Sequence, residues 1–266
     1  MSSALFSLKG KVALVTGATN GIGRGMVTGL AEAKIDQIIF IHRPSTDPQS
    51  TIDSLIKAHP NPEDFTISTI EADLGSLKIE DIESKIVKKS LQLSKTGKID
   101  ILINNAGISY RSPIIDYPDD EFNKVLHVNL NVPTKLSQLI GKHMIENKIR
   151  GKILFTASLL SFQGGVNVSA YAVSKGGILQ LTKALSNEWA SYGINVNSIA
   201  PGYIKTNMTR NISDDEKRNN EILSRIPYGR WGDIFDFKGP TVFLASSASD
   251  YVSGESLVVD GGWMGR

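Results

Sequence analysis

The chain has 266 residues, of which 41% are hydrophobic, and its formal net charge is only +2 at pH 7. This length and composition fit one α/β domain with a sizeable core, and so small a net charge gives no electrostatic signature of nucleic-acid or membrane-surface binding. Because the sequence contains no cysteine, disulfides and thiolate metal sites are excluded.

The chain also lacks recognisable targeting signals. Residues 1–10 have neither the basic segment nor the long apolar stretch of a signal peptide, and no stretch approaches the ~18 apolar residues of a membrane span. The C-terminal residues 263–266 match no retention or peroxisomal signal. We therefore expect a cytoplasmic protein.

Short β-rich runs alternate with longer segments of helical periodicity along the whole chain. The predicted strands are Val12–Val15, Gln37–His42, Phe65–Glu71, Ile99–Ile103, Lys152–Ala157, Asn195–Ile199 and Ser256–Val259. The predicted helices are Gly23–Ala33, Ile79–Leu93, Val132–Glu146, Tyr171–Tyr192 and Phe235–Ala245. This alternation predicts a doubly wound Rossmann α/β fold, with a mostly parallel seven-stranded sheet and helices on both faces, in a single domain over residues 1–266.

Two segments between these elements are predicted to be surface insertions. Pro44–Pro62 contains four prolines, which interrupt regular structure. Thr206–Trp231 is polar and then aromatic, and Ser213 and Glu216 form a capping-box pattern that predicts the start of a short helix. Because ligands bind beyond the carboxyl ends of the strands in such folds, we expect residues 206–231 to form a substrate lid.

A glycine-rich turn joins the first predicted strand to the first predicted helix. Gly17 permits a tight turn, Gly21 lets a pyrophosphate approach the backbone, and Gly23 allows the helix to pack closely on the strand. The helix N-terminus would supply free N–H groups for the phosphates. An ordinary glycine-rich turn is the alternative, because short glycine motifs have many false positives.

A serine, a tyrosine and a lysine form the second candidate constellation. Ser158 ends a predicted strand, and the i, i+4 spacing places Tyr171 and Lys175 on one face of the following helix. A phenol can donate the proton that reduction of a ketone requires, and a neighbouring cation is expected to lower its pKa. Ser158 could hydrogen-bond the same carbonyl oxygen. A Tyr–Lys pair alone also occurs by chance in many helices.

Taken together, these residues resemble the short-chain dehydrogenase/reductase family over nearly the whole chain. Thr16–Gly23 is similar to its T-G-x-x-x-G-x-G loop, and Asn104–Gly107 to its N-N-A-G segment. The resemblance implies NAD(P)-dependent interconversion of a secondary alcohol and a ketone without a metal. Asn129, Ser158, Tyr171 and Lys175 fall on the catalytic positions. In that scheme Tyr171 transfers the proton, Lys175 binds the nicotinamide ribose and lowers the Tyr171 pKa, Ser158 orients the carbonyl, and Asn129 supports a proton relay.

The same resemblance gives the expected cofactor contacts. They are Gly17, Thr19, Asn20, Gly21, Ile22, Gly23, Asp73, Leu74, Asn105, Ala106, Gly107, Tyr171, Lys175, Pro201, Gly202, Ile204 and Thr206. His42 and Arg43 join them because they end the second strand, where an acidic residue would favour NAD. Arg43 could instead bind a 2′-phosphate, so NADP(H) is favoured and NAD(H) is the alternative. Arg43 pointing only into solvent is the plain alternative.

Residues 160–165, 199–203, 225–232 and 243–251 are similar to the branch containing 2-deoxy-D-gluconate 3-dehydrogenases and 2-dehydro-3-deoxy-D-gluconate 5-dehydrogenases. This implies a small sugar-acid substrate, with other ketones or polyols as alternatives. The candidate substrate contacts are Arg111, Leu160, Gln163 and Tyr203; Arg111 could pair with a carboxylate or be a surface arginine. The resemblance also implies a homotetramer. A nucleotide-binding regulator without catalysis is the competing class, and the complete catalytic set argues against it.

Overall fold

The computed structural model describes residues 2–265, so Met1 and Arg266 at the ends of the predicted domain lie outside the described residues. The strands are β1 (Val12–Thr16), β2 (Gln37–His42), β3 (Thr66–Glu71), β4 (Ile101–Asn104), β5 (Lys152–Thr156), β6 (Asn195–Pro201) and β7 (Ser256–Val259). They form one seven-stranded sheet in the order β3-β2-β1-β4-β5-β6-β7, and every neighbouring pair is parallel. The predicted doubly wound fold is confirmed.

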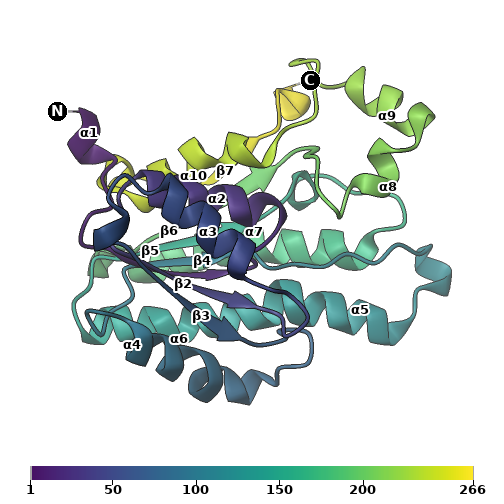
Figure 1. Ribbon diagram of the computed structural model, residues 1–266. Helices are drawn as coiled ribbons and strands as arrows, with labels where there is room; N and C mark the ends of the chain where they lie inside the picture. Colours follow the sequence, from purple (N-terminus) through teal and green to yellow (C-terminus); the bar gives the residue numbers. More distant parts are fainter. Residues whose placement is uncertain (1, 266) are drawn as a thin grey trace.

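Helices cover both faces of this sheet (Figure 1). One face packs against α2 (Gly21–Glu32), α3 (Gln49–Ala58) and α10 (Lys238–Ala245), and the other against α4 (Lys88–Leu93), α6 (Val132–Glu146) and α7 (Ser169–Trp189). The remaining helices are α1 (Ser2–Leu5), α5 (Asp119–Leu126), α8 (Arg210–Ser213) and α9 (Glu216–Leu223). Within residues 2–265 no helix is long and apolar enough to cross a membrane.

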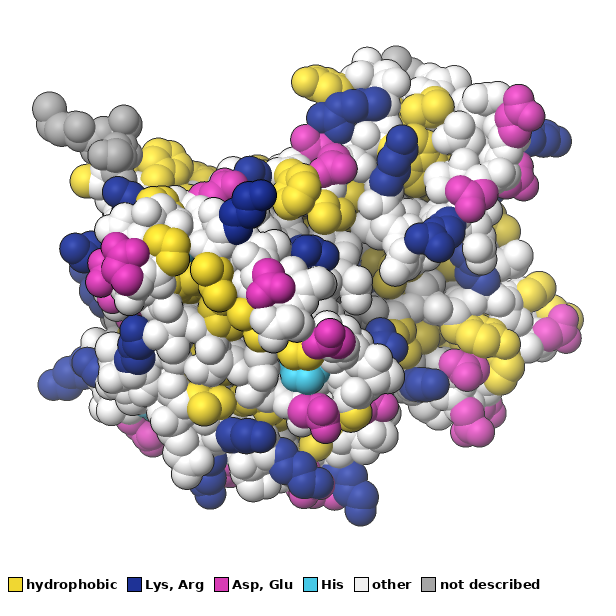
Figure 2. All heavy atoms as spheres, in the orientation of Figure 1, with side chains coloured by type: hydrophobic (Ala, Val, Ile, Leu, Met, Phe, Trp, Pro, Cys, Tyr) yellow, Lys and Arg dark blue, Asp and Glu magenta, His cyan; other side chains and the backbone are white. Residues whose placement is uncertain are grey.

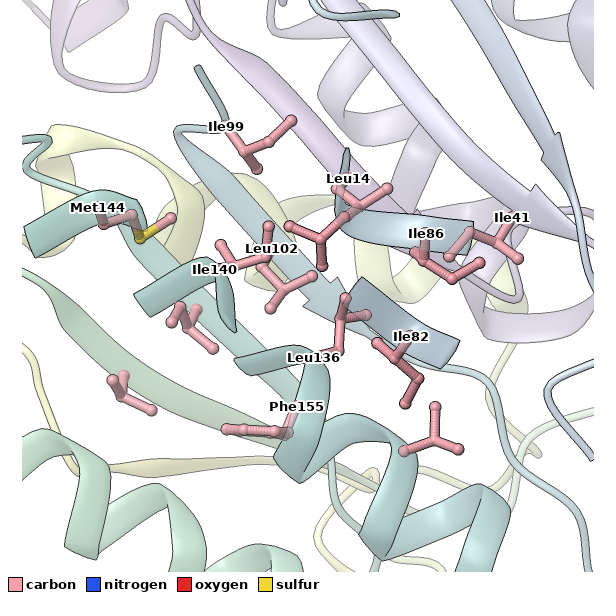
Figure 3. Packing of buried hydrophobic residues seen from close by; sticks show 14 of the residues in the cluster. Leu14, Ile41, Ile82, Ile86, Ile99, Leu102, Leu136, Ile140, Met144 and Phe155 are labelled. Atoms are coloured by element: carbon pink, nitrogen blue, oxygen red, sulfur yellow. The ribbon is translucent and has the colours of Figure 1, made fainter. Parts of the chain in front are cut away.

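The central strands β1, β2, β4, β5 and β6 are almost wholly buried because both faces of the sheet are covered, whereas the edge strands β3 and β7 are partly exposed. Figure 3 shows one of the two resulting cores, in which strand and helix side chains interdigitate. Its labelled members are Leu14, Ile41, Ile82, Ile86, Ile99, Leu102, Leu136, Ile140, Met144 and Phe155. Each is nearly inaccessible to solvent, and burial of such a side chain stabilises the fold by about 2 kcal/mol. This packing makes the sheet a rigid base for the loops at its carboxyl edge.

The strand order reverses direction between β1 and β4. Their following loops therefore diverge to opposite faces and leave a crevice at the carboxyl ends of the strands. Thr16, the last residue of β1, pairs in register with Asn104, the last residue of β4. The glycine-rich turn and the Asn104–Gly107 segment consequently begin side by side.

Both predicted insertions contain helices that differ from the expectation. Within Pro44–Pro62, α3 begins directly after Pro48 and buries Thr51 and Leu55, because proline is compatible with a helix start. In the second segment, Ser213 ends α8 and does not cap a helix. Asp215 caps α9 instead: its backbone is extended, and its carboxylate accepts a hydrogen bond from the Arg218 N–H at 3.0 Å.

Candidate active site

A cleft of about 870 Å³ opens at the carboxyl edge of the sheet, and loops following β1 to β6 line it. In the space-filling view this face is hollowed between the segment carrying α8 and α9 and the rest of the molecule (Figure 2). Every predicted cofactor contact except Gly23 lines the cleft. Those residues are Gly17, Thr19, Asn20, Gly21, Ile22, His42, Arg43, Asp73, Leu74, Asn105, Ala106, Gly107, Tyr171, Lys175, Pro201, Gly202, Ile204 and Thr206.

The glycine-rich turn has the geometry of an anion site. Gly17 and Gly21 have φ angles of +69° and +54°, in the left-handed region that favours glycine. Asn20 precedes α2 but makes no side-chain capping hydrogen bond, so the first-turn N–H groups of α2 face the cleft without a side-chain cap. Gly23 lies behind this surface, where a Cβ atom would collide with the Gly17 carbonyl and the Asn105 amide.

Hydrogen bonds fasten this turn to its neighbours. The Thr16 hydroxyl accepts from the N–H groups of Asn105 and Ala106, each at 3.0 Å. The Asn105 amide donates to the Gly17 carbonyl at 2.9 Å and accepts from the Thr156 hydroxyl at 3.1 Å. Side chains thus join the ends of β1, β4 and β5, so the cleft floor is preorganised.

One end of the cleft is lined by His42, Arg43, Ser45 and Thr46. His42 is buried, and its Nδ1 lies 3.0 Å from the Arg43 carbonyl oxygen, whereas the Arg43 side chain is exposed at the rim. Among the described lining residues, none of those that end or follow β2 is acidic. Among the described lining residues, the only acids are Asp73 and Glu121 on other elements, and the Asp73 carboxylate accepts from the Gly75 N–H at 3.0 Å.

The catalytic candidates meet at the other end. Ser158 lies two residues after β5 and caps a short 3₁₀ helix, η6 (Leu159–Ser161), while Tyr171 and Lys175 lie one turn apart on α7. Lys175 is only 3% exposed, and its ammonium donates to the Thr156 carbonyl at 2.5 Å. Burial lowers the Lys175 pKa from 10.5 to about 8. The Lys175 nitrogen lies 5.6 Å from the centre of the Tyr171 ring.

The Tyr171 pKa differs from the expectation. Burial of the phenol raises its pKa above 10.0, and a hydrogen bond with Ser158 opposes this rise. The expected lowering by Lys175 is not the net result, because the ammonium lies over the ring and burial outweighs the Ser158 hydrogen bond. Tyr171 therefore keeps its proton at neutral pH and can act as a proton donor.

Asn129 does not line the cleft but lies directly behind it, within a π-helical turn, η5 (His127–Asn131). Its amide exchanges two hydrogen bonds of 2.9 Å with the backbone of Ile108 and donates to the Ser174 hydroxyl at 3.1 Å. Asn129 thereby joins the loop after β4 to α7. Such π-turns often occur at functional sites.

The four predicted substrate contacts are not brought into the cleft lining. Arg111 is exposed in the loop after β4, and Leu160 and Gln163 are partly exposed beyond Ser158. Tyr203 packs its ring against Trp231 and Trp263, with centroid distances of 5.5 and 4.7 Å. Its aromatic side chain serves the packing beneath the 206–231 segment.

The sequence interpretation also missed residues that do line the cleft. They include Ala72, Gly75, Ile108, Ser109, Glu121, Lys124, Val128, Thr156, Ala157, Asn207, Met208 and Thr209. Three of these could have been grouped from the sequence. Glu121, Lys124 and Val128 have the i, i+3, i+7 spacing that places residues on one face of a helix. The first turn of α5 holds three acidic residues, at 119–121, where the helix dipole favours negative charge.

The segment predicted as a lid carries α8 and α9, which project from the body beside the C-terminus (Figure 1). Thr206 to Thr209 line the cleft. A small apolar cluster supports the segment from below, with Leu159, Ile222, Ile226, Trp231 and Trp263 as its buried members. Leu159 adjoins Ser158, so this cluster reaches the catalytic end of the cleft.

Comparisons with known proteins agree with this geometry. A family model described as enoyl-(acyl carrier protein) reductase matches residues 17–264. The 2-dehydro-3-deoxy-D-gluconate 5-dehydrogenases of Pseudoalteromonas atlantica and Bacillus subtilis are each 49% identical to this chain, over 98% of it and over 98% and 97% of their own lengths. A crystal structure of gluconate 5-dehydrogenase from Burkholderia cenocepacia, in complex with NADP and tartrate, superposes with a TM-score of 0.88 at 33% identity, covering 100% of both chains. The chain belongs to the short-chain dehydrogenase/reductase family.

Proposed function

We propose that this protein is an NADP(H)-dependent oxidoreductase that interconverts the C5 hydroxyl of a gluconate-type sugar acid and the corresponding ketone. The main observation behind this proposal is that Ser158, Tyr171 and Lys175 meet at one end of a cleft. A glycine-rich turn with the geometry of an anion site lines another part of the same cleft. The relatives' names share oxidation at C5 of such acids, which selects the substrate class.

The described residues fit a dinucleotide. The cleft of about 870 Å³ lies near the upper end of the usual range for small-molecule sites. Gly21 and the start of α2 would hold the pyrophosphate, and Asp73 and Leu74 the adenine. Gly23 supports the fit, because any side chain there would displace the Gly17 carbonyl and the Asn105 amide from the phosphate turn.

Arg43 supports a preference for NADP(H). Its exposed guanidinium stands at the cleft rim beside Ser45 and Thr46, where a 2′-phosphate could accept charge-assisted hydrogen bonds. Among the described lining residues, no carboxylate ends or follows β2, where it would face the 2′-phosphate. The NADP bound to the gluconate 5-dehydrogenase from Burkholderia cenocepacia agrees with this preference.

The proposed mechanism assigns a role to each catalytic candidate. The bound nicotinamide supplies or accepts the hydride. Tyr171 donates its phenolic proton to the ketone oxygen in reduction and takes the hydroxyl proton in oxidation. Ser158 donates a hydrogen bond to the same oxygen and holds it beside the phenol.

Lys175 and Asn129 act on that proton transfer. The Lys175 ammonium stabilises the phenolate that forms when Tyr171 gives up its proton, and it would bind the nicotinamide ribose. Asn129 holds the loop after β4 against α7 and supports the proton relay. Residues 206–231 form the lid that excludes water from the substrate.

Initial rates with a substrate panel test the proposal. D-gluconate and 2-dehydro-3-deoxy-D-gluconate would be oxidised with NADP and NAD, and 5-keto-D-gluconate reduced with NADPH and NADH, while nicotinamide absorbance is followed. We expect turnover of at least one sugar acid, with kcat/KM at least tenfold higher for the phosphorylated cofactor. If simple ketones and polyols react but no sugar acid does, the substrate assignment is wrong and the reaction class stands.

A homotetramer and a cytoplasmic location remain predictions. Light scattering after size-exclusion chromatography tests the assembly, and a mass of about four chains is expected. A monomer that turns over the sugar acid at the full rate would remove the tetramer from the proposal without affecting the chemistry.

A further inference from the structure

One hydroxyl connects the two segments that carry the catalytic candidates. The Ser161 Oγ accepts a hydrogen bond from the Ser158 N–H at 3.2 Å and donates one to the Lys175 carbonyl at 2.7 Å. Ser158 lies two residues beyond the end of β5, and Lys175 lies on α7. The two hydrogen bonds of the Ser161 hydroxyl therefore connect the loop after β5 to α7.

A second bond joins the same segments from the opposite side of Ser158. The Lys175 ammonium donates to the carbonyl of Thr156, two residues before Ser158, at 2.5 Å. Ser158 is thus held between two attachments to one residue of α7, one through the Lys175 side chain and one through its backbone. The Ser158 hydroxyl additionally accepts from the Leu160 N–H at 3.1 Å, which fixes its rotamer.

We propose that Ser161 is a positioning residue for the hydride-transfer reaction, because its hydroxyl sets the distance between the Ser158 hydroxyl and the Tyr171 phenol. This inference rests on the proposed function where it predicts a change in kcat, but not where it predicts a change in the titration of the Tyr171 phenol. Ser161 does not line the cleft, so it acts through Ser158 and α7 and contacts neither substrate nor cofactor.

The consequence follows from what remains when the hydroxyl is removed. In Ser161→Ala the Ser158 N–H and the Lys175 carbonyl both lose a partner, although the Lys175 carbonyl keeps its place within α7. The Ser158 loop then loses its attachment to the α7 backbone and keeps only the side-chain hydrogen bonds from Lys175 to Thr156 and between Tyr171 and Ser158. A small displacement of a positioned group is sufficient to lower a rate markedly.

The test compares Ser161→Ala, Ser161→Thr and the control Ser186→Ala with the wild type. Ser186 lies farther along α7, and its hydroxyl bonds the Ser253 hydroxyl at 2.7 Å, away from the cleft. Each variant is assayed for kcat and for KM of cofactor and sugar acid. Independently of any substrate, Tyr171 is titrated by phenolate absorbance, using Tyr171→Phe to subtract the other tyrosines.

We expect Ser161→Ala to lower kcat about tenfold while the cofactor KM changes less than about twofold. We also expect its Tyr171 titration to move to higher pH, because the Ser158 hydrogen bond lowers that pKa. Ser161→Thr, which keeps a hydroxyl, should restore both values, and Ser186→Ala should change neither.

The proposal is overturned if Ser161→Ala matches the wild type in the phenol titration, or if Ser161→Thr is as impaired as Ser161→Ala. It is also overturned if Ser186→Ala loses turnover to the same extent, since the effect would then belong to the stability of α7. A wild type that turns over no sugar acid counts against the proposed function alone, because the titration still decides the role of Ser161.

Discussion

Replacing Lys175 with Met removes a buried charge. Comparing the free energy of unfolding of this variant with that of the wild type measures how much the charge destabilises the fold, separately from its role in catalysis. Below pH 8 the lysine is protonated in both the folded and the unfolded chain, so the folded chain carries the whole cost of burying the charge. As the pH rises from about 8 to 10.5, the folded chain loses its proton first and this cost disappears. The lowered pKa corresponds to roughly 3 kcal/mol of unfolding free energy.

The expected result is therefore a pH-dependent difference between two proteins. Relative to Lys175→Met, the free energy of unfolding of the wild type should rise by about 3 kcal/mol between pH 7 and pH 10.5. The hydrogen bond to the Thr156 carbonyl is stronger from the ammonium than from the neutral amine, so its weakening at high pH would reduce this rise. Turnover of Lys175→Met should be lost at every pH.

Urea denaturation at a fixed protein concentration, repeated at three pH values, measures this difference. Lys183→Met is the matched control, because Lys183 lies exposed on the same helix and its replacement should give a pH-independent difference. Parallel stability curves for the wild type and Lys175→Met would refute the reasoning, since the lysine would then be equally ionised in both states.

Three further variants test the site. Tyr171→Phe should lower kcat by about 10²–10⁴-fold and leave the Kd of NADPH within about threefold; turnover within tenfold of the wild type would contradict its acid–base role. Arg43→Ala should weaken NADPH binding about 10–100-fold and spare NADH, as judged by cofactor fluorescence titration; equal effects on both cofactors would remove the 2′-phosphate contact. Gly23→Ala should abolish binding of both cofactors in a chain that still folds, because the new methyl displaces the Gly17 carbonyl and the Asn105 amide. Normal cofactor affinity with unchanged circular dichroism would show that the turn can adapt.

The strands were predictable because short apolar or β-branched runs between turn residues determine them locally. Gln37–His42, a buried strand, and Ser256–Val259, a partly exposed edge strand, both have the predicted bounds. Gln49–Ala58 was missed because the neighbouring prolines suggested a loop, although Pro48 precedes a helix start. Prolines in a sequence show that regular structure is interrupted, but they do not determine whether a helix lies before or after them.

The residues of the site also differ in how well the sequence predicts their positions. The cofactor contacts follow strand ends, and a strand's position in a parallel sheet determines where its end lies. The substrate contacts depend on side-chain direction in loops. Tyr203 shows the difference: its position after β6 suggested the pocket, whereas its ring packs against Trp231 and Trp263.

Burial of Tyr171 and Lys175 favours a state in which the phenolate and the ammonium are present at the same time over a state in which only one of them is charged. It raises the pKa of Tyr171 and lowers that of Lys175, so each charge alone is disfavoured. When Tyr171 gives its proton to a ketone, the phenolate forms near an ammonium that lies 5.6 Å from its ring centre. Their attraction is stronger in this poorly solvated end of the cleft than in water, so the same burial that disfavours the separate ions supports the pair that reduction produces.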